Sequence, residues 1–283
     1  MEPILLNVQL PFSYWQKRDP ETGAPLMRPD GRLLARYLDA LCREIRSLGA
    51  DMDDATVGAV HFAGGYMSLL SPDEFTAVMA ALHRSFRFVQ KPQVSGVLFP
   101  GSLDMALISV YGDAGVAPLM FEVPSLLARE CERLSLPNAL QALDQTVFLM
   151  QNFGVSDFGL RLPVGIAGRD EGAWRFMLGQ IRHYQPRCVQ FVDVSGGQVA
   201  EHPAFSEVRQ ALAQQGLAEC APNLLCAGEP PRFAQEGPCL GVGLGAVSRL
   251  DGYETRNTAQ LDAYLAGAGD YRNLIVSVRE LDK

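Results

Sequence analysis

The sequence lacks features that would assign it to several large classes of protein. Its six cysteines form no Cys-x-x-Cys pair, so the spacing typical of redox motifs and many zinc sites is missing. No apolar run approaches the roughly 20 residues that span a membrane, and the first residues carry no basic segment of a secretory signal. We therefore expect a soluble, cytoplasmic protein with reduced, mostly buried thiols.

Basic residues are also scarce. The chain has 24 Lys and Arg against 32 Asp and Glu, which gives a net charge of −8 at pH 7. An acidic surface repels phosphate, so we expect neither nucleic acid nor a membrane as a partner. The 283 residues are 48% hydrophobic and only 20% charged. This composition predicts one large or two modest folded domains that need no cross-links.

Strand-like and helix-like patterns alternate over the first two thirds of the chain. Apolar runs predict strands at 4–10, 57–62, 94–99, 117–123, 157–163 and 188–194. Helical periodicity predicts helices at 33–48, 71–86, 102–114, 125–134, 138–154 and 170–184. The polar stretch 16–31 interrupts this order, and a loop of that length is typically functional or mobile. The remainder has helices at 205–215 and 258–265, a glycine-rich segment at 241–245 and a strand at 273–278.

This alternation predicts parallel β/α units. We expect an α/β fold: a partial (β/α)6 TIM-like barrel over residues 1–195, with a small C-terminal α+β extension, residues 196–283, packed on it. Ligands of such barrels bind at the carboxyl ends of the strands. The loops that should surround this mouth are 11–18, 63–68, 100–101, 122–125 and 161–168.

Several segments carry motifs in an informative order. These are 8–13 (VQLPFS), 37–45 (YLDALCREI), 61–71 (HFAGGYMSLLS), 241–246 (GVGLGA), 250–252 (LDG) and 257–258 (NT). In order and spacing they resemble the oxygen-independent coproporphyrinogen III oxidase family of radical S-adenosylmethionine (SAM) proteins, which also contains a heme chaperone. The resemblance covers most of the chain and implies a barrel of the radical SAM type.

The resemblance also implies that the cofactor site is degenerate. The family holds a 4Fe–4S cluster on a Cys-x3-Cys-x2-Cys motif, and these positions fall on Ser13, Lys17 and Pro20. Cluster iron needs thiolates, which a hydroxyl, an ammonium group and a proline ring do not replace. We therefore predict that the 4Fe–4S cluster is absent and expect no cofactor.

Other family positions around the pocket differ as well. Asn7 and Gln9 align with a tyrosine and a histidine of the family. Val97 aligns with its third-strand glutamate, Pro124-Ser125 with its fourth-strand polar pair, and Arg161 with its fifth-strand aspartate. Its Gly-Gly-Gly-Thr-Pro loop, which resembles a site for the amino end of SAM, reads Ala63-Gly64-Gly65-Tyr66-Met67. These changes do not favour SAM binding.

The same loops supply the candidate ligand-binding residues Gly64, Gly65, Tyr66, Ser125 and Arg161. The two glycines either present N–H groups to a ligand or form a tight turn that needs positive φ. Tyr66 would fill part of the former cofactor space. Arg161 and Glu122 either bind a polar ligand across the mouth or form a structural ion pair.

Catalytic residues are less well indicated. His61, Tyr66, Glu122 and Arg161 are the candidates; His61 either acts as a general acid or base or packs where the family has phenylalanine. Cys220, Cys226 and Cys239 are either metal ligands or small hydrophobic side chains. Their spacing matches no standard site, so we expect no metal.

Three functions remain open. The first is a radical-SAM-like pseudoenzyme without a cluster, which binds a small molecule or serves as scaffold or partner of an active radical SAM or pathway enzyme. The second is an enzyme with repurposed, iron–sulfur-independent chemistry in the barrel mouth. The third is a tetrapyrrole- or heme-binding protein, by analogy with the family's heme chaperone.

Overall fold

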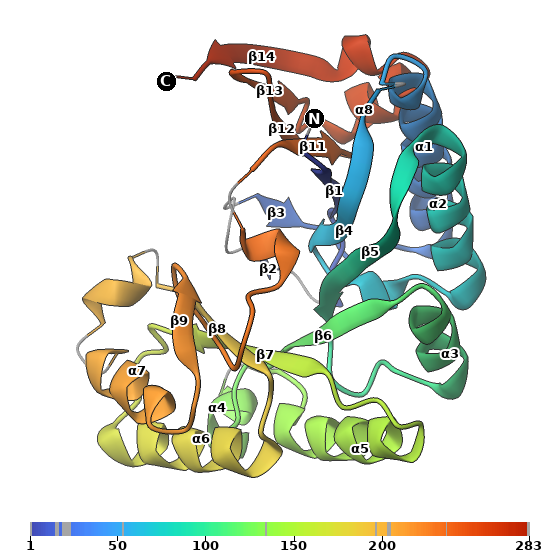
Figure 1. The fold of residues 1–283 in the computed structure, drawn as a ribbon. Helices are drawn as coiled ribbons and strands as arrows, with labels where there is room; N and C mark the ends of the chain where they lie inside the picture. The colour runs from blue at the N-terminus through green and yellow to red at the C-terminus, as the bar shows by residue number, and fades with distance from the viewer. Residues whose placement is uncertain are drawn as a thin grey trace. The chain divides into compact units, whose positions relative to one another are not determined.

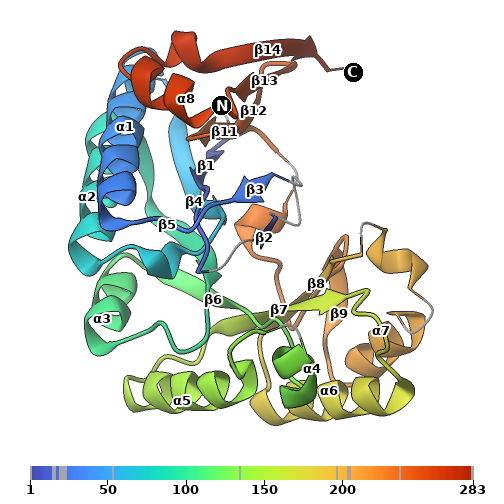
Figure 2. The same ribbon diagram turned by 180° about the vertical axis from the view of Figure 1, so that it is seen from behind.

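The computed structural model describes residues 2–14, 17–18, 24–52, 54–133, 135–195, 197–202, 205–235 and 237–281. The chain divides into two compact units. Unit 1 comprises Met1–Gly96, Ser109–Val116 and Glu236–Lys283, and unit 2 comprises Val97–Ile108 and Ala117–Gln235. Each unit packs helices against a sheet (Figures 1 and 2).

Unit 1 is built on both parallel and antiparallel strands. Its strands are β1 (Ile4–Leu10), β4 (Thr56–Gly64), β5 (Arg87–Leu98), β11 (Cys239–Val242), β12 (Val247–Leu250), β13 (Tyr253–Asn257) and β14 (Ile275–Glu280). They follow the order β14-β13-β12-β11-β1-β4-β5 (Figure 1). β1 pairs in parallel with β4 on one side and with β11 on the other. The strands β12 to β14 extend the sheet from β11 in antiparallel pairs.

The helices of unit 1 are α1 (Gly31–Gly49), α2 (Pro72–Ser85) and α8 (Leu261–Gly267). α1 and α2 lie side by side on one face of the parallel strands (Figures 1 and 2). The apolar stripe of α1 is buried, since Tyr37, Leu41 and Ile45 are fully covered. α2 begins with a capping box: Ser71 Oγ accepts a hydrogen bond from the Glu74 N–H, and the Glu74 carboxylate accepts one from the Ser71 N–H.

Unit 2 contains a further group of strands and helices. Its elements are β6 (Val116–Glu122), α4 (Ala128–Arg133), α5 (Ala139–Asn152), β7 (Phe158–Val164), α6 (Glu171–Tyr184), β8 (Cys188–Asp193), α7 (Phe205–Ala213), β9 (Ala218–Ala221) and β10 (Leu224–Cys226). The strand order is β6-β7-β8-β10-β9. β6, β7 and β8 are parallel, whereas β10 is antiparallel to β8 and β9. α5 and α6 run along one face of these strands (Figure 1). Residues of α3 (Met105–Asp113) belong to both units.

The predicted α/β class and all six predicted strands are confirmed, as β1, β4, β5, β6, β7 and β8. The stretch 16–31 is not wholly a loop in its described part, because β2 (Lys17–Arg18) pairs with β3 (Pro25–Leu26). The glycine-rich segment 241–245 begins inside β11, which the sequence patterns missed. Residues after 195 contribute to both units, and the domain division at 195 stays a prediction.

No described helix combines the length and the apolar character that crossing a membrane requires.

Candidate functional site

Polar side chains of unit 1 gather on one face of its parallel strands. Asn7 in β1 pairs in register with His61 in β4, and His61 pairs with Ser95 in β5. In-register neighbours point to the same side of a sheet, whereas successive residues of a strand point to opposite sides. Phe62, the neighbour of His61, contacts Phe75 of α2 with ring centroids 5.5 Å apart. The side chains of Asn7, His61 and Ser95 therefore lie on the face turned away from α2.

Gln9 lies two residues beyond Asn7 on the same strand, so its side chain is on the same face. We call Asn7, Gln9, His61 and Ser95 the polar row. His61 Nδ1 lies 2.9 Å from Ser95 Oγ, which fixes the imidazole within the row. A catalytic role for His61 stays a prediction.

The polar row presents hydrogen-bond acceptors. Asn7 Oδ1 and Gln9 Oε1 are buried and have no hydrogen-bond partner among the described residues. The Asn7 amide nitrogen already donates to Cys239 Sγ at 3.4 Å. An unpaired buried acceptor costs about 1–3 kcal/mol, so an N–H or O–H group placed here by water or by a ligand is stabilising.

The glycine loop after β4 closes tightly on the end of β1. The Gly65 N–H donates to the Leu10 carbonyl at 2.6 Å, and the Tyr66 N–H donates to the Phe12 carbonyl at 3.0 Å. Gly64 has a φ of +84°, which favours glycine. The close contacts and the positive φ explain why glycine occupies both positions. A ligand-binding role for the loop stays a prediction.

Replacing Gly65 by alanine should lower the free energy of unfolding by about 2 kcal/mol. A Cβ at this position would lie 1.8 Å from the Phe12 carbonyl oxygen, so the backbone must shift. Chemical denaturation measures the change. Gly112→Ala is the matched control, because a Cβ there meets nothing within 4 Å. Equal stabilities of the two variants would contradict the tight closure of the loop.

Ser13, the first position that aligns with a cluster cysteine, lies in a closely packed segment after β1. Ser13 is fully buried, and its N–H donates to the Met27 carbonyl at 2.8 Å. Tyr66 is also fully buried, with its ring centroid 5.4 Å from that of Tyr14. The aligned Lys17 belongs to β2, and Pro20 lies outside the described residues.

Glu122 and Arg161 are neighbours on adjacent strands of unit 2. They pair in register between β6 and β7, and Arg161 Nη1 lies 3.8 Å from Glu122 Oε2. Both side chains are buried. Of the two roles left open by the sequence, the structure contains the ion pair, and ligand binding by these residues stays a prediction. His61 and Tyr66 belong to unit 1, so the four catalytic candidates divide between the units.

Ser125 takes part in a buried network of unit 2. Its hydroxyl donates to Glu130 Oε2 at 2.6 Å. Arg169 donates two hydrogen bonds to the same carboxylate, from Nη2 to Oε2 at 2.8 Å and from Nε to Oε1 at 3.2 Å. Burial raises the pKa of Glu130, but the hydrogen bonds from Arg169 and Ser125 outweigh it and lower that pKa. Ser125 therefore holds a structural carboxylate here, and its ligand-binding role remains a prediction.

A carboxylate–imidazole pair at the end of β8 escaped the sequence patterns. Asp193 contacts His202 Nε2 and accepts hydrogen bonds from the N–H groups of Ser195 at 2.7 Å and Gly197 at 2.9 Å. Burial raises the pKa of Asp193, yet these hydrogen bonds, with that of His202 the strongest, lower it to about 2. Its position at the carboxyl end of a predicted strand was the one available signal, because carboxyl ends of strands carry sites in this class of fold.

A buried carboxylate on α1 was missed as well. Glu44 accepts hydrogen bonds from the Tyr264 hydroxyl at 2.7 Å, the Gly243 N–H at 2.8 Å and the Asn257 amide at 2.6 Å. Burial raises its pKa to about 7, although these bonds oppose the shift. The sequence held a signal, since Glu44 falls on the apolar stripe of α1, three residues after Leu41.

All six cysteines are free thiols. Cys131, Cys188 and Cys226 are buried, while Cys42, Cys220 and Cys239 are half-buried. Within the described ranges, no three His, Cys, Asp or Glu side chains are placed so that they could hold a metal ion.

Comparison with known proteins identifies the fold. No protein-family model and no curated protein matches the chain. Coproporphyrinogen III oxidase (HemN) from Escherichia coli, a radical SAM enzyme, is similar in structure, with a TM-score of 0.84 and 17% identity over 99% of this chain and 72% of that one. Two other solved structures are more distant. Elp3 from Methanocaldococcus infernus has a TM-score of 0.44 and 12% identity over 74% of this chain and 49% of that one. The hydrogenase maturase HydG has a TM-score of 0.46 and 10% identity over 74% of this chain and 49% of that one. At such identity the likeness to HemN shows the fold alone: the predicted HemN-like fold of the radical SAM type is confirmed.

Proposed function

We propose that this protein, which has a HemN-like radical SAM fold, is a ligand-binding pseudoenzyme that carries no 4Fe–4S cluster. The observation that carries the proposal is the polar row, in which Asn7 and Gln9 present buried, unpaired amide oxygens beside His61 and Ser95. Such unpaired acceptors are suited to a ligand with N–H or O–H donors.

The residues at the aligned cluster positions do not fit an iron–sulfur cluster. Ser13, Lys17 and Pro20 offer no thiolate, and Ser13 is buried with its N–H bonded to Met27. The six thiols all lie elsewhere in the sequence. Cluster iron requires cysteine ligands, so neither a cluster nor reductive SAM cleavage takes part in the proposed function.

Anaerobic reconstitution with iron and sulfide tests the missing cluster. We expect the purified protein to bind no stoichiometric iron after desalting and to lack the visible charge-transfer absorption of such clusters. The positive control is the triple variant Ser13→Cys, Lys17→Cys and Pro20→Cys, which restores the family's spacing. Uptake of about four irons per chain by the unaltered protein would overturn the proposal.

Ligand binding at the polar row is tested separately. HemN is named for its action on coproporphyrinogen, and pyrrole N–H groups are donors of the kind that the row accepts, so coproporphyrin is the first probe. Heme, in which iron replaces these hydrogens, is the second. We expect a saturable change in porphyrin absorbance that is lost in Asn7→Leu and Gln9→Leu and kept in the exposed-site variant Asp39→Asn. Binding that survives both leucine variants would place the ligand elsewhere.

The buried His61–Ser95 contact supports a second candidate function, repurposed chemistry without iron or SAM. Under this alternative, His61→Gln abolishes turnover of an identified substrate without loss of fold, as measured by circular dichroism. A partner role beside an active radical SAM or pathway enzyme is a further form of the pseudoenzyme proposal. Co-purification with such an enzyme, lost when the protein's surface is altered, would support it.

A further inference from the structure

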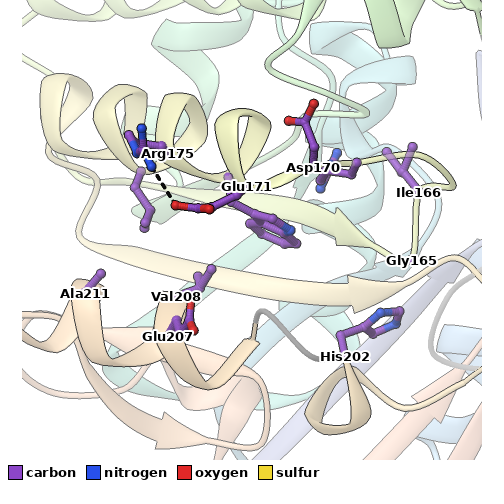
Figure 3. A pocket seen from close by; sticks show the side chains of 12 residues that line it. Gly165, Ile166, Asp170, Glu171, Arg175, His202, Glu207, Val208 and Ala211 are labelled. Atoms are coloured by element: carbon purple, nitrogen blue, oxygen red, sulfur yellow. Dashed lines mark hydrogen bonds and ion pairs between the residues drawn. The ribbon is translucent and has the colours of Figure 1, made fainter.

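A separate cavity of about 610 Å³ lies between α6 and α7 of unit 2. This volume suits a small organic molecule. Much of its wall is apolar, from Ile166, Trp174, Leu178 and Val208. Figure 3 shows Glu207 of α7 across from Glu171 and Arg175 of α6, with His202 and Gly165 at one end. None of these residues belongs to the polar row.

The imidazole at the end of the cavity is held in place by a carboxylate. His202 Nε2 faces the ionised Asp193 carboxylate, so this nitrogen carries the hydrogen. The ring packs close to Gly165, where a Cβ would lie 3.1 Å from His202 Cε1 and 2.8 Å from Ser195 Oγ. Glycine at 165 therefore makes room for the held imidazole.

Charges around the cavity are matched except at one position. Arg175 pairs with Glu171 at 2.6 Å. Arg169 pairs with the buried Glu130 at 2.8 Å. Glu207, on the first turn of α7, has neither a hydrogen bond nor an ion pair with any residue that the structure describes. The cavity thus offers an uncompensated carboxylate, an imidazole held in one orientation and an apolar wall.

We propose that this cavity binds a small organic amine with an apolar body. Its ammonium group is met by the Glu207 carboxylate, while its body lies against Trp174 and Leu178, with the His202 ring at one end. A carboxylate accepts hydrogen bonds, and the unmatched negative charge favours a cation over a neutral or anionic ligand.

Titration with 2-phenylethylamine tests the site. The chain has two tryptophans, Trp15 and Trp174, so in a Trp15→Phe background the fluorescence reports on the cavity alone. We expect a saturable fluorescence change, and about tenfold weaker binding of 2-phenylethanol, which keeps the apolar body without the charge.

Variants separate this site from adventitious binding. Glu207→Gln should weaken the amine about tenfold. Glu201→Gln, an exposed carboxylate that does not line the cavity, is the matched control and should bind as the parent does. Equal affinity for amine and alcohol, an unaffected Glu207→Gln variant, or no saturation up to about 10 mM would each overturn the proposal. The outcome is independent of the polar row, since porphyrin binding is measured with its own variants.

Discussion

Arg169→Met is expected to destabilise the protein by about 3–5 kcal/mol at neutral pH. The substitution leaves the Glu130 carboxylate buried beside the Ser125 hydroxyl, which alone does not compensate its charge. It also removes the bond of 2.7 Å from Arg169 Nη1 to the Pro163 carbonyl. Methionine fills a similar volume, so the loss reports on the unpaired charge rather than on a cavity.

Urea denaturation at several pH values measures this effect and its sign. Because Arg169 lowers the pKa of folded Glu130, the pair stabilises the protein above the ordinary carboxyl pKa and loses this contribution as the pH falls. The deficit of the variant should therefore shrink toward acid pH. A deficit that stays constant with pH would contradict the role of the ion pair.

Two further variants sharpen the Arg169 experiment. Arg129→Met is the matched control, because Arg129 lies 3.7 Å from Asp170 at an exposed site, where an ion pair contributes about 0–1 kcal/mol. Adding Glu130→Gln to Arg169→Met removes the unpaired buried charge and should recover part of the lost free energy of unfolding. If the double variant is no more stable than Arg169→Met, lost packing explains the effect.

The second large effect is expected from Glu44. Its pKa is raised from 4.5 to about 7 by burial, so the folded state keeps a proton that the unfolded state has released between these values. Stability from this group is present at pH 4.5 and below, and is lost as the pH rises through 7. The total difference amounts to about 3 kcal/mol.

Comparison with Glu44→Gln isolates this contribution from other titrating groups. The free energy of unfolding of the unaltered protein, relative to that of the variant, should fall by about 3 kcal/mol between about pH 4.5 and about pH 8. Asp39→Asn is the control on the same helix, because the Asp39 side chain is 69% exposed. Parallel pH profiles of the unaltered protein and Glu44→Gln would show that Glu44 titrates normally.

The fold was predictable where structure follows from local sequence. The six parallel strands are apolar runs, and helices such as α2 carry their own start signal in Ser71 and Glu74. β11 has no such signal, because it is only four residues long and contains Gly241, and its pairing partner β1 lies far away in the sequence. A Cβ at Gly241 would lie 2.4 Å from the Val247 carbonyl, so this glycine reflects a close approach rather than a loop.

Part of the candidate site was predictable on the same grounds. His61 is near the end of a recognisable strand, whereas its register with Asn7 and Ser95 is known only from the pairing of the strands in the structure. The pair of Asp193 and His202 was not predictable, because it depends on a turn whose course brings together residues nine apart. Likewise, the partners of Glu44 come from distant segments of the chain, and no spacing rule connects them.

The place of β11 beside β1 has a consequence for how the protein is made. Leu5 pairs with Cys239 and Val8 with Val242, so β1 keeps one edge open during synthesis until the ribosome has delivered β11. An exposed edge of this kind is a template for pairing with other chains. A nascent chain stalled before residue 239 should therefore be unusually dependent on chaperones.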